Sequence, residues 1–134
     1  DLKYLIEKGH TIGAHTINHR RLTEIKSESE LRIEIIESGD ILEQRLGIKI
    51  NHFAYPFGCF NSISSEAIDI IKERYAFCYS AVRGRNSAGN NAYALLREAI
   101  SSDDTSEYLR FIIEDGLGIL YKMRALKLNK ITND

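Results

Sequence analysis

The segment Ile48-Lys-Ile-Asn-His-Phe-Ala-Tyr-Pro-Phe-Gly58 decides the fold of this chain. Its first eight residues are rich in isoleucine and aromatic side chains, which predicts a strand over 48–55. Pro56 and Gly58 stop that strand, because proline cannot donate to a ladder and both residues favour turns. The segment therefore predicts a strand that ends abruptly in a turn.

Amphipathic helical patterns lie on both sides of this strand. The preceding helix is predicted to begin at Ser27, where Glu30 completes a capping box, and to end at Gly47. The residues that share its apolar face are Leu31, Ile35, Leu42 and Leu46. A second helix is predicted over 64–74 by the same criterion. The central strand is thus flanked by two helices, which is typical of βα units.

Three further strands are predicted, over 10–15, 76–82 and 94–100. Four strands separated by helices predict parallel βα units with right-handed crossovers. Such sheets are buried on both faces or closed into a barrel. Since four units cannot close a barrel, we expect either an open sheet or further strands upstream. The fold class is therefore α/β.

The two ends of the chain complete this organisation. A helical pattern over 1–8 starts directly at the first residue, which predicts a piece of a longer polypeptide. A last helical region is predicted to start at Asp104 or Thr105 and to break near 116–118. The polar sequence from Lys127 predicts a frayed tail over 127–134, which leaves 1–126 as the domain.

Composition excludes several classes of protein. The 134 residues are 43% hydrophobic and 28% charged, which suits one compact domain or part of one. Eighteen basic and nineteen acidic residues give a net charge of -1, without the basic stripe that nucleic-acid binding requires. No apolar run is long enough to span a membrane. Two cysteines exclude a disulfide-rich scaffold.

The sharpest functional feature is His15-Thr-Ile-Asn-His19, where the first predicted strand runs into a loop. Two imidazoles four residues apart face the same side if the segment turns helically. Neutral imidazole suits zinc, and a catalytic zinc takes about three protein ligands and an open position. The sequence therefore predicts a zinc site at His15 and His19, with a chance pair of surface histidines as the alternative.

A second feature is the aromatic turn Phe53-Ala-Tyr-Pro-Phe-Gly58 at the end of the central strand. Proline beside glycine fixes a sharp turn and lets the backbone approach a ligand closely. An exposed backbone N–H in such a turn can serve as an oxyanion donor. Taken alone, this segment is better explained as an ordinary aromatic-flanked turn, and it becomes a candidate site only beside the histidine pair.

Together these two segments resemble the polysaccharide deacetylase family, a group of carbohydrate esterases. The sequence Gly9–His19 is similar to the family's second motif, whose two histidines bind the metal, with Thr16 at its Ser/Thr position. Phe53–Gly58 is similar to its third motif, which lines the acetyl pocket. The resemblance covers roughly residues 1–100 and implies a partial, distorted (β/α) barrel with about four βα units present.

The resemblance implies a metal-dependent hydrolase that removes acetyl groups from N-acetylated or O-acetylated glycans. It implies zinc, or cobalt or nickel in its place, on His15 and His19, and a backbone N–H at Phe57 as oxyanion donor. The residues expected to bind the acetylated oligo- or polysaccharide are Tyr55, Pro56, Phe57 and Arg97. The sequence leaves the compartment open, and the resemblance favours an extracytoplasmic or cell-envelope location.

The chain departs from the family pattern in three places. The Asp-Asp motif that supplies the catalytic base and the third metal ligand is absent, and we expect it upstream of Asp1. Ala54 stands where many members have arginine, and no histidine follows His52 to supply a general acid. The adjacent aspartates Asp103 and Asp104 read as a helix start. The chain alone is therefore expected to be inactive.

Two other functions fit the same residues. One is a degenerate deacetylase domain that binds glycan without turning it over. The other is a scaffold in which His15, His19, Cys59 and Cys78 hold a structural zinc. Cys78, however, falls within an apolar strand, where free cysteine usually packs as a small hydrophobe.

Overall fold

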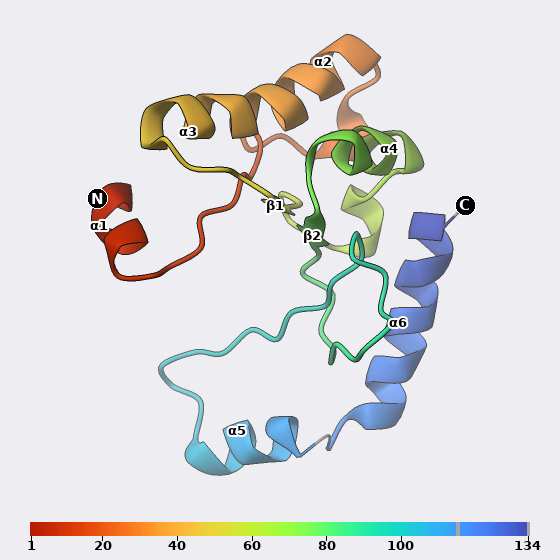
Figure 1. Ribbon diagram of the computed structural model, residues 1–134. Helices are drawn as coiled ribbons and strands as arrows, with labels where there is room; N and C mark the ends of the chain where they lie inside the picture. Colours follow the sequence, from red (N-terminus) through yellow and green to blue (C-terminus); the bar gives the residue numbers. More distant parts are fainter. Residues whose placement is uncertain (115, 134) are drawn as a thin grey trace.

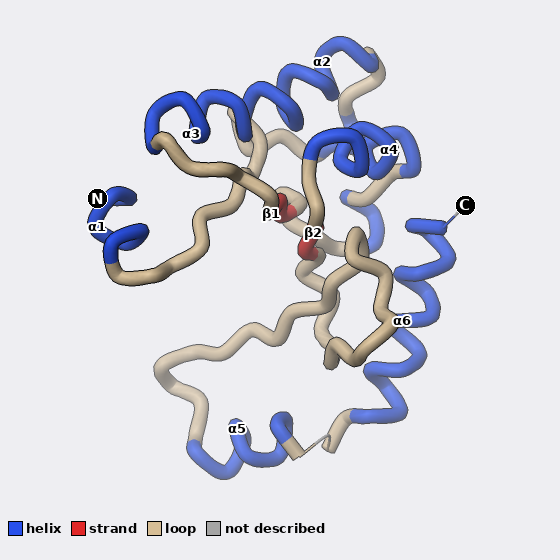
Figure 2. Tube along the Cα trace, viewed as in Figure 1, coloured by secondary structure: helices blue, strands red, loops and turns tan. Residues whose placement is uncertain are grey.

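The computed structural model describes residues 1–114 and 116–133. Its helices and strands, in chain order, are α1 (Leu2–Glu7), η1 (Leu22–Glu24), α2 (Glu28–Arg32), η2 (Ile33–Glu37), α3 (Ser38–Leu46), β1 (His52–Ala54), η3 (Phe60–Ser62), α4 (Ser65–Arg74), β2 (Phe77–Tyr79), α5 (Ser106–Ile113) and α6 (Gly118–Asn133). η1 and η3 are 3₁₀ turns, whereas η2 is a π-helical turn. The fold is mixed α/β, with far more helix than strand (Figure 2).

The strands pair in parallel and in chain order. β1 lies next to β2 with Phe53 opposite Cys78. Ala14 forms a parallel bridge to Phe53 on one side, and Tyr79 forms another to Leu95 on the other side. The four segments predicted as strands therefore lie side by side. Helices connect the first three of them, as expected of βα units, whereas a loop without a helix joins β2 to the segment around Leu95.

These strands are shorter than predicted. Regular pairing covers only three residues of 48–55 and three of 76–82. The segments 10–15 and 94–100 each contribute a single bridge and are not strands. A ladder lasts only where two segments run side by side, and the outer segments have a partner on one side only. The left-handed backbone of Thr16 (φ 62°) ends the first of them.

Helices cover one face of this small sheet. α2, η2, α3 and α4 pack together on one side of the sheet (Figure 1). The side chains of Phe53 and Cys78 belong to the core on that side and are both buried. On the opposite face, His52 stacks on Phe77 with 5.0 Å between ring centroids, and Tyr79 lies beside them. That second face is partly exposed in the described chain, which differs from the expectation that both faces are buried.

The predicted helix between Ser27 and Gly47 is confirmed. The Ser27 hydroxyl accepts a hydrogen bond from the Glu30 N–H (3.4 Å), and Gly47 ends the helix with φ 68°. The Glu30 carboxylate pairs with Arg20 at 2.9 Å. The sequence did not predict that the π-helical turn η2 interrupts this helix between α2 and α3.

The C-terminal region is helical to a greater extent than expected. Thr105 caps α5, and the predicted break near 116–118 matches the interval between α5 and α6. The predicted frayed tail is wrong for 127–133, because α6 continues to Asn133. The reason is burial: Leu128 is 0% exposed and belongs to the core. Asp134 lies outside the described residues.

Among the residues that the structure describes, no helix is both long enough and apolar enough to cross a membrane.

Candidate functional site

The two sequence motifs meet at one edge of the sheet. His15 directly follows the bridging residue Ala14, and the aromatic turn directly follows β1. Carboxyl ends of parallel strands lie at the same edge, which is where such folds place their ligands. The structure therefore brings together the histidine pair and the turn.

The histidine rings lie close enough to share one ligand. Their centroids are 4.9 Å apart, with an interplanar angle of 59°. The Nδ1 atom of His15 lies 2.8 Å from the carbonyl oxygen of Ala54. A carbonyl oxygen only accepts, so Nδ1 carries the proton and Nε2 keeps a free lone pair. This arrangement, with one ring nitrogen anchored by a backbone carbonyl, is typical of metal-binding histidines.

The path of the backbone between the two rings differs from the prediction. We expected a helical turn, but residues 15–19 form an irregular loop. Thr16 and His19 both adopt left-handed backbone angles, with φ 62° and 54°. These two left-handed residues, and not the expected helical turn, bring the two histidine rings together.

Backbone strain is concentrated at this site. Among the residues described, the non-glycine residues with positive φ are Thr16, His19 and Phe57. Such a conformation costs about 1–3 kcal/mol per residue, and it is least favourable for a β-branched residue such as threonine. The Thr16 hydroxyl oxygen is also buried without a hydrogen-bond partner in the described chain. Strain that persists in this way is typical of functional sites.

Phe57 forms an aromatic wall next to the histidines. Its ring centroid is 5.0 Å from that of His19, and the Arg21 guanidinium carbon lies 4.4 Å from the ring centroid on its face. The Gly58 N–H donates to the Pro56 carbonyl oxygen at 2.7 Å, so Phe57 is the central residue of a γ-turn. Within the described ranges its own N–H has no acceptor, which leaves that donor available to a ligand.

Tyr55 and Pro56 are core residues. Tyr55 is 1% exposed and packs edge-on against Phe53, with 6.0 Å between ring centroids. Burial raises the pKa of the Tyr55 hydroxyl well above its usual value. Pro56 is also fully buried. The structure therefore does not support the prediction that these two side chains contact substrate; of that segment, Phe57 alone is exposed, at 50%.

Arg97 lies at the same edge but farther along the sheet. Its Nε donates to the Ser80 carbonyl oxygen, just after β2, at 2.6 Å. Its side chain is exposed and has no carboxylate partner among the described residues. Arg97 is therefore oriented by the strand end, without direct contact with the histidines.

The cysteines do not join the histidine pair. Cys78 is fully buried beneath the sheet, and burial strongly raises the pKa of its thiol, which disfavours the thiolate that zinc needs. Cys59 is exposed, and hydrogen bonds with Ser62 and Arg21 lower the pKa of its thiol. In residues 1–114 and 116–133, no cluster of three or more potential ligands exists. The alternative of a four-ligand structural zinc on His15, His19, Cys59 and Cys78 is therefore wrong for the part of the chain that the structure describes.

One residue that the sequence analysis did not identify is Glu34, in the π-helical turn η2. It is 2% exposed, and it accepts hydrogen bonds from the Ile17 N–H (3.0 Å), the Asn18 N–H (2.9 Å) and the Asn18 side-chain amide (2.8 Å). Burial by itself would raise its pKa, but hydrogen bonds from Asn18 and Ile17 lower it overall. Its signal in the sequence is a carboxylate three residues after Leu31, on the apolar face.

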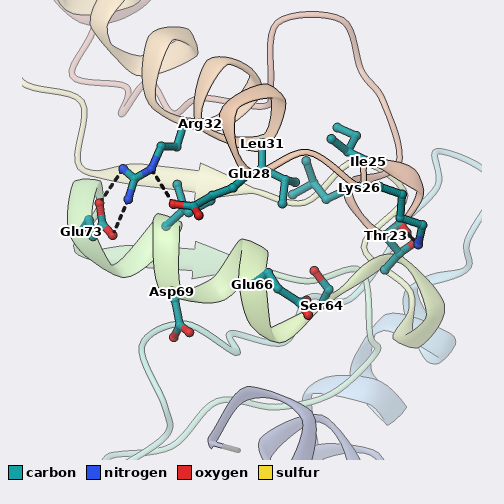
Figure 3. A pocket seen from close by; sticks show the side chains of 12 residues that line it. Thr23, Ile25, Lys26, Glu28, Leu31, Arg32, Ser64, Glu66, Asp69 and Glu73 are labelled. Carbon is teal, nitrogen blue, oxygen red and sulfur yellow. Dashed lines mark hydrogen bonds and ion pairs between the residues drawn. The ribbon is translucent and has the colours of Figure 1, made fainter.

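Two cavities lie near these elements. One of about 510 Å³ lies between α2 and α4, with an apolar floor that includes Leu31 and a charged rim where Arg32 pairs with Glu73 (Figure 3). Its lining includes no residue of the histidine site. A smaller cavity of about 310 Å³ is lined by His15, His52 and Tyr79 on the open face of the sheet. The second cavity therefore adjoins the histidine site.

The histidine pair fits a divalent metal but does not complete its coordination. One imidazole nitrogen is fixed for ligation and a second ring lies beside it. A catalytic zinc takes about three protein ligands. The described residues would therefore offer two imidazoles to such an ion, and among them no cluster of three or more potential ligands exists.

A family profile and several solved structures similar to this chain are all described as deacetylases. The family profile described as polysaccharide deacetylase matches residues 1–73. The fold is similar to that of the Streptococcus pyogenes deacetylase PplD in complex with acetate, with a TM-score of 0.73 and 25% identity over 81% of this chain and 47% of that one. It is also similar to BA0330 of Bacillus anthracis (TM-score 0.70, 24% identity, 82% and 34% covered). A third similar structure is that of BC0361, a polysaccharide deacetylase of Bacillus cereus, with a TM-score of 0.67 and 22% identity over 81% of this chain and 34% of that one.

The chain spans less than half the length of each of these structures, at 47%, 34% and 34%. No curated protein sequence matches it significantly. The family profile nevertheless covers more than half of the chain and includes both the histidine pair and the aromatic turn. This chain belongs to the polysaccharide deacetylase family.

Proposed function

We propose that this chain carries the histidine half of the active site of a carbohydrate deacetylase, a hydrolase that removes acetyl groups from acetylated glycans. The observation that carries the proposal is the pair of rings 4.9 Å apart, with His15 anchored on Ala54 at the edge of a parallel sheet. Membership of the family supports the acetylated glycan as substrate.

We infer that His15 and His19 hold a divalent metal, zinc or alternatively cobalt or nickel. Such an ion supplies a Lewis acid that polarises the acetyl carbonyl and lowers the pKa of a bound water. The anchored Nδ1–H of His15 leaves Nε2 directed away from Ala54 as a ligand. The third ligand and the catalytic base belong to a carboxylate outside the 134 residues.

The aromatic turn supplies the other half of the chemistry. The Phe57 N–H, which has no acceptor among the described residues, is placed to donate to the oxygen that becomes negative during attack on the acetyl group. The exposed Phe57 ring offers an apolar face to the sugar or to the acetyl methyl group. We propose that Arg97 pairs with the carboxylate that supplies the base, which its contact with the Ser80 carbonyl oxygen at the strand end supports.

The incomplete barrel and the missing base have one explanation in this proposal. Because the chain spans less than half of its structural relatives, we propose that the remaining strands and the base are contributed by further chain. On this view the 134 residues alone bind metal weakly and do not release acetate. We also propose an extracytoplasmic or cell-envelope location for the complete protein, which rests on the family alone.

The test compares metal binding by matched histidine variants. Calorimetric titration of the 134-residue chain with zinc should give one site, which is weakened at least tenfold by His15→Ala and by His19→Ala. His10→Ala is the control, because that histidine is exposed and lies outside the pair. Full zinc affinity in both site variants would refute the ligand assignment.

Activity is tested on the complete parent protein. Acetate release from an acetylated chitooligosaccharide should be lost in the same two variants and retained in His10→Ala. If the parent protein binds an acetylated oligosaccharide but releases no acetate, the alternative of a glycan-binding module without activity is correct.

A further inference from the structure

The π-helical turn η2 places a carboxylate directly under the loop of the histidine pair. Glu34 belongs to this turn, and its side chain is buried. Both of its oxygens are engaged: Oε2 by the Ile17 and Asn18 backbone N–H groups, and Oε1 by the Asn18 side-chain amide. Three donors from the middle of the loop thus converge on one side chain.

This contact explains how a strained loop stays in place. Left-handed angles at Thr16 and His19 turn the backbone so that consecutive N–H groups, from Ile17 and Asn18, point to the same side. Such a concave arrangement of N–H groups binds an anion. A charged acceptor forms hydrogen bonds roughly twice as strong as a neutral one, which can offset the conformational cost.

Other groups do not share the role of Glu34. The positive charge of Arg20 helps to lower the pKa of Glu34, but the Arg20 guanidinium forms its ion pair with Glu30, at 2.9 Å. Glu37 lies in the same turn but is exposed and makes no hydrogen bond or ion pair among the described contacts. π-helical turns occur frequently at functional sites, where an extra residue redirects a side chain.

We propose that Glu34 is a positioning residue, which holds the 15–19 loop so that His15 and His19 keep the separation needed to share one metal. The metal part of this inference rests on the proposed function, whereas the part that concerns the loop does not. Glu34 is not assigned as a ligand, because it is buried beneath the loop and, among the described residues, forms no cluster of three potential ligands with the histidines. It acts through the backbone of residues 17 and 18.

The test uses two isosteric variants with the same change in charge. Glu34→Gln replaces one acceptor oxygen by an NH₂ group that must face a donor, whereas Glu37→Gln makes the same change at an exposed position. We expect zinc affinity of the 134-residue chain to fall tenfold to hundredfold in Glu34→Gln and to stay within twofold in Glu37→Gln. Equal affinity of Glu34→Gln and the unsubstituted chain would overturn the proposal.

A metal-free measurement separates this inference from the proposed function. Amide hydrogen exchange at Ile17 and Asn18 should accelerate at least tenfold in Glu34→Gln while exchange in α4 is unchanged. If the unsubstituted chain binds no zinc, the proposed function fails, but the exchange rates still decide the role of Glu34. Unchanged exchange at both amides would refute it.

A third variant covers the case in which Glu34→Gln does not fold. Asn18→Ala removes only the side-chain donor, at an exposed position, and leaves the carboxylate in place. We expect a smaller loss of zinc affinity, about threefold to tenfold, with an unchanged unfolding midpoint. Unchanged affinity in a folded Asn18→Ala protein would count against the proposal in the same way.

Discussion

The Nδ1 atom of His15 lies 2.8 Å from the carbonyl oxygen of Ala54 and is thereby tied to the last residue of β1. The segment that precedes His15 pairs with the same residue, since the Ala54 N–H donates to the Ala14 carbonyl oxygen at 2.9 Å. One residue of the central strand therefore fixes both the backbone before His15, through its N–H, and the orientation of the His15 ring, through its carbonyl oxygen. The pairing of Ala54 within the sheet therefore also determines the position of His15 in the site.

This contact predicts the tautomer of His15. Above about pH 8, where an ordinary imidazole is neutral, His15 should carry its proton on Nδ1, because Ala54 offers only an acceptor. The ¹⁵N shifts of the ring nitrogens measure this directly, and exposed His10 is the internal reference. An Nε2–H form of His15 would contradict the structure.

Gly58 predicts a sharp limit on substitution in the aromatic turn. It has φ +62°, and a Cβ atom there would lie 2.4 Å from the Ala81 backbone nitrogen. Since that nitrogen donates to the Gly58 carbonyl oxygen, the two segments cannot separate without loss of the contact. Gly58→Ala should lower the free energy of unfolding by about 3 kcal/mol or more.

Gly89→Ala is the matched control for this substitution. Gly89 also has positive φ (+90°), but an added Cβ atom meets nothing within 4 Å. The expected loss is therefore the conformational cost alone, about 1 kcal/mol. Urea denaturation of both variants separates strain from steric overlap, and equal losses would contradict the close approach at Gly58.

The sequence predicted those parts of the fold that local chemistry determines. Ser27, Ser64 and Thr105 each cap a helix as their position before an apolar pattern indicates. The parallel direction of the paired segments followed from the alternation of helix and strand, whereas their order was not predicted. Tyr55 was expected to contact substrate from its place in the motif, but it shares a face with Phe53 and is buried with it.

Long-range contacts determine the rest of the site. No local pattern assigns a left-handed angle to threonine, so the path from His15 to His19 could not be read from the sequence. The loop is held there by Glu34, sixteen residues beyond Asn18. The short strands have a similar cause, since their length depends on how far neighbouring segments remain side by side.

Leu128 predicts that the last helix contributes to stability. Its side chain is 0% exposed within the core, although the surrounding sequence is basic and polar. Leu128→Ala should lower the free energy of unfolding by about 2–5 kcal/mol. Leu126→Ala is the control in the same helix, because Leu126 is 59% exposed and should change stability by less than about 0.5 kcal/mol. Equal effects in thermal or urea unfolding would show that α6 does not pack as described.

Phe57 allows backbone strain and ring function to be measured separately. Its φ of 63° is unfavourable for any side chain, whereas glycine adopts it without steric cost. Phe57→Ala and Phe57→Gly both delete the ring and its contact with Arg21, but only the glycine variant relieves the strain. The glycine variant should therefore be the more stable of the two by about 1 kcal/mol, in spite of its larger unfolded-state entropy.

Ligand binding by these two variants should not follow their stability. If the exposed ring contacts the acetylated sugar, both variants of the complete parent protein should lose affinity for an acetylated chitooligosaccharide by the same factor, about tenfold, since a stacked aromatic contact contributes roughly 1–1.5 kcal/mol. Calorimetric titration measures this, with Phe77→Ala as a control that removes an exposed ring of β2, stacked on His52 and outside the aromatic turn. Recovery of affinity in the glycine variant alone would mean that the turn, and not the ring, determines recognition at this edge of the sheet.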